Sequence, residues 1–170
     1  MPENQSKKQI VKSKKQEEKT MGETPMPQKL KVLFLCTANA CRSQMAEGWA
    51  QHLKSDVIDA FSAGVMPARV SSRAIAVMKE VGVDISSHYS KHVDDLVGID
   101  FDYVVTVCDN AREQCPIFTG KAKMAHISFE DPTSVIGTEQ EVLAKFRKVR
   151  DQIREFVAKL PDNLTTNKHE

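Results

Sequence analysis

The sequence has few cysteines, few aromatic residues and almost no net charge. Its 170 residues include 4 Cys, 6% aromatics and a formal charge of +1. This charge balance argues against nucleic acid or an anionic membrane as a partner. No apolar run approaches the roughly 20 residues of a membrane helix, and the Lys- and Gln-rich N-terminus lacks the apolar region of a secretory signal. We therefore predict a cytoplasmic location. Structural disulfides are rare there, so the four cysteines are candidates for free thiols, metal binding or redox chemistry.

The first 29 residues differ in composition from the rest. They hold seven Lys and four Glu, no aromatic residue, and a Thr-Pro-Met-Pro stretch near their end. Such a segment buries too little apolar area to offset the entropy cost of ordering it. We predict a flexible basic tail over 1–29, one domain over 30–162 and a C-terminal tail over 163–170. Two alternatives stay open: a basic arm that touches a membrane or nucleic acid, or a true start at Met21.

From residue 30 onward, predicted strands alternate with predicted helices. Apolar or β-branched segments indicate strands at 32–35, 57–61, 102–107 and 124–129. This alternation predicts a single three-layer α/β domain, with a four-stranded parallel sheet flanked by helices. Helical spacing indicates a first helix with Met45, Trp49 and Leu53 on one face, and a second that begins at Ser71 or Ser72, carries Ile75, Met78 and Val81, and ends at Gly82. A short helix is predicted over 90–96. A long helix begins with a Thr138–Glu141 capping box and ends at Pro161, and its inward residues are predicted to be Leu143, Phe146, Val149, Ile153, Phe156 and Leu160.

Chemically active side chains follow three of the four predicted strands. Cys36 follows the first strand, Cys108 ends the third, and Glu130 and Asp131 follow the fourth. Right-handed crossovers bring the carboxyl ends of parallel strands to one edge of the sheet. Ligands of open α/β sheets bind at that edge, near the switch in strand order. We therefore predict the functional site there.

The segment CTANACRS, residues 36–43, lies between a predicted strand and a predicted helix. Backbone N–H groups of such a loop form a concave anion site, and the helix N-terminus adds partial positive charge. Arg42 supplies a planar fork for two oxygens of a tetrahedral oxyanion. The positive surroundings and the Ser43 hydroxyl favour the thiolate of Cys36, which then acts as a nucleophile. The predicted oxyanion-binding residues are Thr37, Ala38, Asn39, Ala40, Cys41 and Arg42.

The loop also allows a simpler interpretation. Cys36 would then be a small buried hydrophobe and Arg42 a surface residue. The position directly after a buried strand, with Asn39 inside the loop and Ser43 after the arginine, favours the anion site. For Cys41 the preference is reversed: its side chain is predicted to pack rather than react.

Three blocks carry a family resemblance. CTANACRSQMAEG, residues 36–48, resembles the active-site loop of the low-molecular-weight tyrosine phosphatase fold, and more closely that of the thioredoxin-coupled arsenate reductases built on that fold. The second block is VVTVC at 104–108, followed after six residues by Cys115 and Pro116, and the third is FEDP at 129–132. The blocks occur in the family's order, and the resemblance runs from about residue 30 to residue 160.

The resemblance implies a reaction cycle with three thiols. Cys36 attacks arsenate, Cys108 attacks Cys36 and releases arsenite, and Cys115 then attacks Cys108. Reduced thioredoxin, as electron donor, opens the final Cys108–Cys115 disulfide. The last exchange is expected to require residues 109–114 to unwind or swing outward. Arsenate and thioredoxin are thus the expected partners of a monomer without bound cofactor or metal, and weak phosphatase activity is expected as well.

The general acid of this cycle is predicted to be Asp131, which precedes Pro132 as in the family, with Glu130 as the competing carboxyl. Phosphatases of this fold usually carry aromatic residues after that Asp-Pro pair, to hold the phenol ring. Here Thr133, Ser134 and Val135 follow. This departure favours a small inorganic oxyanion over phosphotyrosine.

Two rival functions stay open. One is a low-molecular-weight protein tyrosine phosphatase with incidental thiols. The other, from a different class, is a zinc module or redox sensor, although the 36/41 and 108/115 spacings are wider than those of usual zinc sites.

Some family members bind potassium near the loop. Asn39, Glu47 and Ser62 match three of the ion's ligand positions, but Lys91 stands at the fourth. We hypothesise that the Lys91 ammonium takes the ion's place and neutralises Glu47, so that activity needs no potassium. His88 matches a family histidine near the loop and is expected to be structural.

Overall fold

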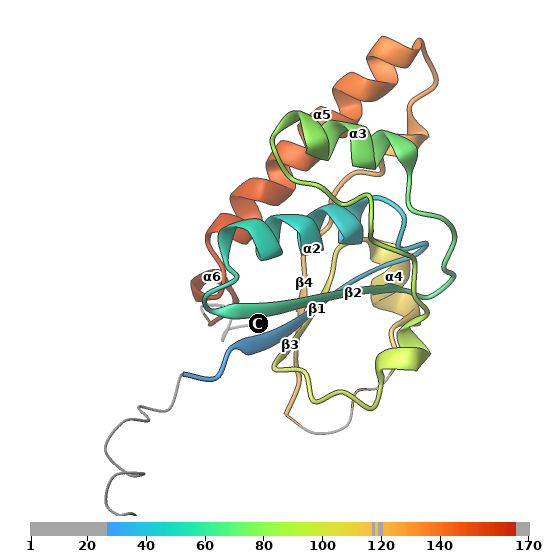
Figure 1. Ribbon diagram of the computed structural model, residues 1–170. Coiled ribbons are helices and arrows are strands. Elements are labelled where there is room, and N and C mark those ends of the chain that lie inside the picture. The colour runs from blue at the N-terminus through green and yellow to red at the C-terminus, as the bar shows by residue number, and fades with distance from the viewer. Residues whose placement is uncertain (1–26, 117, 119–120, 166–170) are drawn as a thin grey trace, which may run out of the picture.

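The structure, a computed structural model, describes residues 27–116, 118 and 121–165. It confirms the predicted α/β domain: a four-stranded sheet in the order β2-β1-β3-β4 lies between helical layers (Figure 1). The strands are β1 (Leu30–Cys36), β2 (Ile58–Gly64), β3 (Tyr103–Thr106) and β4 (Lys123–His126). The helices are α2 (Arg42–Leu53), α3 (Ser72–Glu80), α4 (Asp109–Gln114), α5 (Glu139–Ala158) and α6 (Asp162–Thr165), with 3-10 turns η1 (Val93–Leu96) and η2 (Pro132–Ser134).

Strand β1 is the centre of the sheet and pairs in parallel with β2 on one side and β3 on the other. Its residues 32–36 are buried, as the continuous apolar run predicts. β4 pairs in parallel with β3. Backbone bonds from Ile127 to Thr106 and from Phe129 to Val107 extend that pairing, so the alignment reaches the end of the predicted fourth strand.

Helices α2, α3 and α5 lie together above the sheet in Figure 1, and α5 packs against both α2 and α3. Trp49 of α2 is buried between them and donates its indole N–H to the carbonyl of Arg150 on α5, at 3.1 Å. Phe146, Val149 and Ile153 of α5 are fully buried. The main core therefore lies between this helical layer and the sheet.

The capping signals are confirmed. Ser71 caps α3 by accepting from the N–H of Ala74, and Thr138 forms the expected capping box with Glu141 at the start of α5. Gly82 follows α3 with a φ of 81°, a left-handed conformation that suits glycine.

Two expectations need correction, and one helix was not predicted. The short helix predicted over 90–96 is only the 3-10 turn η1, because Ser90 and Lys91 bond to the anion loop instead. Val81 lies beyond the end of α3 and is 36% exposed, while Ala74 and Val77 are buried with Met78. Helix α4 was not predicted, because its sequence DNAREQ has no apolar stripe.

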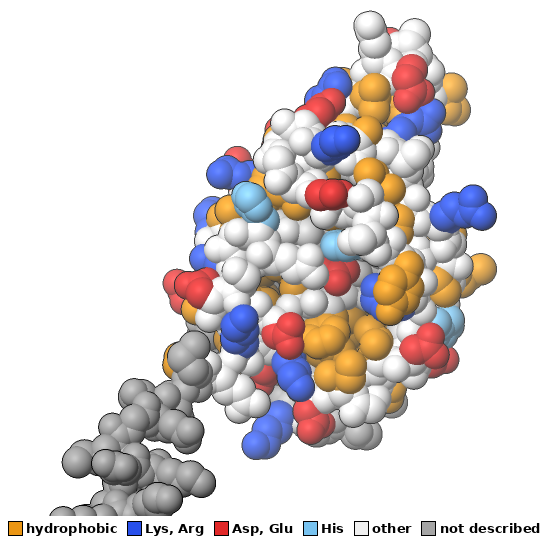
Figure 2. All heavy atoms as spheres, in the orientation of Figure 1, with side chains coloured by type: hydrophobic (Ala, Val, Ile, Leu, Met, Phe, Trp, Pro, Cys, Tyr) orange, Lys and Arg blue, Asp and Glu red, His pale blue; other side chains and the backbone are white. Residues whose placement is uncertain are grey.

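The domain boundaries stay predictions. Residues 1–26 and 166–170 lie outside the described residues, and α6 spans the boundary placed at 162. No helix in the described part of the chain is long and apolar enough to cross a membrane. On the face drawn in Figure 2, acidic and basic side chains are interspersed.

Candidate active site

The candidate site lies where the strand order of the sheet reverses. The chain leaves β1 toward β2 but leaves β3 toward β4, so the ends of β1 and β3 form the switch point. Val107 N–H donates to the Leu35 carbonyl at 2.9 Å, which holds these two ends together. Cys36 ends β1, and Cys108 lies two residues after the end of β3. The predicted convergence of these two thiols at one edge follows from this pairing.

The loop after β1 turns its carbonyl groups outward. Because the C=O and N–H of one peptide unit point in opposite directions, outward carbonyls direct the intervening N–H groups inward. The inner rim of the loop is thus lined with donors, as an anion site requires. The outward bonds span 2.8 to 3.3 Å and join the carbonyls of Cys36, Thr37, Ala38 and Ala40 to the N–H groups of Val65, Met66, Ala68 and Ser71.

Two donors converge on the Cys36 sulfur. The backbone N–H of Asn39 donates to Cys36 Sγ at 3.2 Å, and Ser43 Oγ lies 2.8 Å from the same atom. Asn39 Nδ2 donates to Ser43 Oγ at 2.7 Å. Since the hydroxyl oxygen is already an acceptor there, its own proton is free to point at Cys36. Both donors thus reach the sulfur of a residue that is 3% exposed, and such bonds are stronger when the acceptor is an anion.

Asn39 stabilises the conformation of the loop. It adopts a φ of 50° and is fully buried. Its side-chain Oδ1 accepts from Gln44 Nε2 and from the N–H of Lys91, both at 3.0 Å, and its carbonyl accepts from Ser90 Oγ at 2.8 Å. The left-handed conformation of Asn39 is therefore held by donors from α2 and from the loop before η1.

Arg42 and Asp131 face one another across the mouth of the loop. Arg42 donates to the Phe129 carbonyl at 3.1 Å, and its Nη2 lies 3.8 Å from Asp131 Oδ2. The other carboxyl oxygen, Oδ1, accepts from the N–H and the hydroxyl of Thr133. Glu130 instead pairs with Lys145, and that bond lowers the pKa of Glu130. Glu130 is therefore held as an anion by Lys145 of α5, which supports Asp131 rather than Glu130 as the proton donor.

Cys108 is held by the anion loop itself. The Thr37 hydroxyl lies 3.4 Å from Cys108 Sγ and accepts from Asn110 Nδ2 at 3.0 Å. Because the Thr37 oxygen already accepts from Asn110, the Thr37 hydroxyl proton can be donated to Cys108 Sγ. Cys108 also caps α4 by accepting from the N–H of Ala111. Thr37, the residue after Cys36, thus ties Cys108 to the anion loop.

The other two cysteines differ from these. Cys115 follows α4 and is half-buried, and burial raises its pKa above the ordinary value. Cys41 is 7% exposed, and burial raises its pKa to about 11. Cys41 therefore stays a neutral thiol near pH 7, in keeping with the predicted packing role for its side chain.

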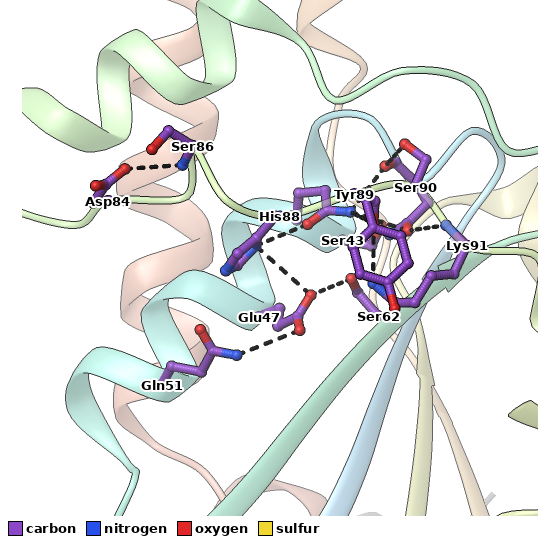
Figure 3. Close-up of polar contacts among 12 residues, drawn as sticks. Ser43, Glu47, Gln51, Ser62, Asp84, Ser86, His88, Tyr89, Ser90 and Lys91 are labelled. Carbon is purple, nitrogen blue, oxygen red and sulfur yellow. Dashed lines mark hydrogen bonds and ion pairs between the residues drawn. The ribbon is translucent and has the colours of Figure 1, made fainter.

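Figure 3 shows the cluster around Glu47 of α2. Glu47 accepts from the Ser62 hydroxyl and from Gln51. Among the residues that the structure describes, the basic side chain nearest to its carboxylate is His88, whose Nδ1 lies 3.8 Å from Glu47 Oε2; no ion pair joins Glu47 to Lys91. The Lys91 ammonium donates to the Tyr89 carbonyl at 3.0 Å and lies over the Tyr89 ring. The predicted contact between Lys91 and Glu47 is therefore wrong, because the Lys91 ammonium binds to Tyr89 within its own loop.

This cluster does not fit a potassium ion. Donors of the protein already occupy the oxygens of Asn39 and Glu47 that match family ligands, and Lys91 brings a positive charge into the same region. His88 donates from Nδ1 to the Gln44 amide oxygen at 2.9 Å, which agrees with a structural role. No group of three or more His, Cys, Asp or Glu side chains among residues 27–116, 118 and 121–165 is arranged to hold a metal.

The family model of low molecular weight phosphotyrosine protein phosphatases matches residues 31–170. The chain belongs to this family. Within it, the chain is 43% identical over 122 residues to an arsenate reductase of Bacillus subtilis (strain 168), covering 72% of this chain and 88% of that protein. It is 41% identical over 128 residues to arsenate reductase 1 of Staphylococcus saprophyticus, covering 75% and 93%.

The similar solved structures include arsenate reductases and a protein tyrosine phosphatase. An arsenate reductase in its oxidized state superposes with a TM-score of 0.65 at 34% identity, covering 79% of this chain and 98% of the other. A low molecular weight protein tyrosine phosphatase from T. tengcongensis superposes with a TM-score of 0.61 at 29% identity, covering 79% and 99%. The resemblance inferred from the three sequence blocks is confirmed.

Sequence reasoning missed several residues of the site. Gln44 and Ser90 hold the loop, and Asn110 orients the Thr37 hydroxyl. These are ordinary polar residues, and no local pattern marks them. Their roles depend on contacts between segments that lie up to 73 residues apart in the chain.

Proposed function

We propose that the protein reduces arsenate to arsenite with electrons from thioredoxin. The observation that carries the proposal is the bridge from Thr37 to Cys108, which ties a second thiol to the loop that holds Cys36. A phosphatase needs one such thiol, and a reductase needs a second thiol within reach of the first. The similarity to proteins named arsenate reductase supports the same function.

In the proposed first step, the Cys36 thiolate attacks arsenic in an arsenate bound by the loop N–H groups and Arg42. Asp131 gives a proton to the departing oxygen, which leaves as water. Cys108 then attacks the Cys36 sulfur. The sulfur–arsenic bond breaks, its electron pair stays on arsenic, and arsenite leaves from a Cys36–Cys108 disulfide.

In the second step, Cys115 attacks Cys108 and Cys36 returns as a thiolate. The Cys108–Cys115 disulfide is then reduced by thioredoxin, through the same exchange chemistry. The two cysteines cap opposite ends of α4, so the helix rise separates their Cα atoms by about 10 Å. A disulfide needs a separation below about 7 Å, so α4 has to unwind in this step.

The second candidate function is phosphotyrosine hydrolysis, which shares Cys36, Arg42 and Asp131. The family match favours it. Against it, the Thr133–Val135 segment after Pro132 offers no aromatic wall for a phenol ring.

An arsenate assay coupled to thioredoxin, its reductase and NADPH separates the two candidates. Cys115→Ser should lose multiple turnover of arsenate, because the relay stops at the Cys36–Cys108 disulfide, while hydrolysis of p-nitrophenyl phosphate continues. Cys36→Ser should abolish both activities. A Cys115→Ser protein that still reduces arsenate at the wild-type steady-state rate would show that the relay is wrong. A wild-type protein that hydrolyses the phosphate ester but oxidises no NADPH with arsenate would favour the phosphatase.

A further inference from the structure

The first residue of α4 is tied to the end of β4. Asp109 Oδ1 lies 2.9 Å from His126 Nε2, and the other ring nitrogen lies 2.7 Å from the hydroxyl of Thr106. Thr106 belongs to β3 and is 3% exposed, so the ring is held from the interior of the sheet. A chain of three side chains therefore joins the sheet to the helix that separates the two relay thiols.

Helix α4 has few other means of staying folded. Ala111 is its one buried residue, and the remaining five side chains are exposed. A six-residue helix is far too short to persist by its own backbone hydrogen bonds. Its stability depends on contacts with the rest of the molecule. Besides the burial of Ala111 and the Cys108 cap, these are the Asp109–His126 pair and the bond from Asn110 to Thr37.

We propose that the Asp109–His126 pair keeps α4 helical and thereby sets the rate at which Cys115 attacks Cys108. The inference rests on the proposed function. In the step concerned, the Cys115 sulfur bonds to the Cys108 sulfur while the Cys36–Cys108 bond breaks. Cys36 leaves as a thiolate and the Cys115 proton passes to solvent, so no outside oxidant or reductant is needed. Asp109 and His126 are positioning residues: they act on the helix and touch no reacting atom.

The test is a single turnover of the full chain with arsenate and no thioredoxin. Samples are quenched in acid and alkylated, and the two disulfides are followed by mass spectrometry. In Asp109→Ala and in His126→Ala, conversion of Cys36–Cys108 into Cys108–Cys115 should be about two- to fivefold faster, the range for a largely exposed pair. The double variant should be no faster than either single variant, since both remove the same contact. Amide exchange over 109–115 should rise in parallel.

Glu113→Ala is the matched control, because it removes an exposed acidic side chain from α4 and leaves the pair intact. Its conversion rate should equal that of the wild type. The inference falls if the single variants convert at the wild-type rate or slower, if Glu113→Ala accelerates as they do, or if the two single effects multiply in the double variant. A purely structural role would lower the unfolding temperature without speeding conversion. A wild-type chain that forms no Cys108–Cys115 disulfide overturns the proposed function, and this inference with it.

Discussion

Asn39 shows how much of the site depends on one side chain. It donates from its backbone to Cys36 and from its amide to Ser43, and it accepts from Gln44 and Lys91. Each of these bonds is buried or partly buried, so removing the amide would leave several groups unsatisfied at once. The loop is therefore rigid before substrate arrives, and little reorganisation is needed when an oxyanion binds.

At the same scale, Cys115 should make the relay depend on pH. Burial raises the pKa of Cys115, so at pH 7 its thiolate is a minor form. The thiolate fraction, and with it the single-turnover rate of Cys108–Cys115 formation, should rise about tenfold between pH 7 and pH 8. Quenched-flow alkylation across that range measures the rate. A rate that levels off below pH 8 would mean that Cys115 ionises more easily than its surroundings indicate.

At the residue scale, the sequence alone was sufficient to bring Cys36, Arg42 and Ser43 together as a candidate site, because one loop contains all three. It also predicted packing rather than reaction for Cys41, and burial raises the pKa of that thiol. It could not predict that the Thr37 side chain, rather than its backbone alone, would contact Cys108. That contact exists because two strands far apart in the chain end side by side.

Among the elements, β2 and the anion loop meet at Gly64. A Cβ built at this glycine would lie 2.7 Å from the Thr37 carbonyl oxygen and 2.8 Å from the Asn39 nitrogen. Both are backbone atoms, so the loop itself would have to move. Gly64→Ala should therefore lower kcat for arsenate and for p-nitrophenyl phosphate by about a hundredfold, and stability by about 1–3 kcal/mol. Steady-state kinetics and denaturant unfolding measure the two effects.

Gly98→Ala is the control for this substitution, since a Cβ there meets nothing within 4 Å. It should leave both activities and the unfolding midpoint unchanged. Equal losses in the two variants, or wild-type kinetics in Gly64→Ala, would contradict the tight contact between β2 and the loop.

The elements themselves were largely predictable because their signals are local. The buried run of β1, the Ser71 cap and the Thr138–Glu141 capping box each occupy a few consecutive residues. Helix α4 had no such signal: it has one buried residue, and its contacts come from β4 and the anion loop. Tertiary contacts, rather than propensity or periodicity, account for it.

On the scale of the whole molecule, the oxygens matching family potassium ligands come from the anion loop, α2 and β2. Protein donors join Asn39 to Gln44 and Lys91, and Glu47 to Ser62 and Gln51. The fold should therefore be complete without the ion. Replacing sodium by potassium chloride, at fixed ionic strength and without sulfate, should change neither the arsenate reduction rate nor the midpoint of thermal unfolding. A clear rise in either would show that the cluster opens to admit the ion.

The strand order has a consequence for how the protein is made. The anion loop is complete only when Ser90 and Lys91 reach Asn39, and Arg42 gains its carbonyl partner only with Phe129. A chain growing on the ribosome thus carries its nucleophile early, but cannot assemble the pocket around it until Phe129 has emerged as well. Pairing of β1 with β3 is long-range and correspondingly slow. The anion pocket is therefore completed long after its nucleophile has been made, once Ser90, Lys91 and Phe129 have joined it.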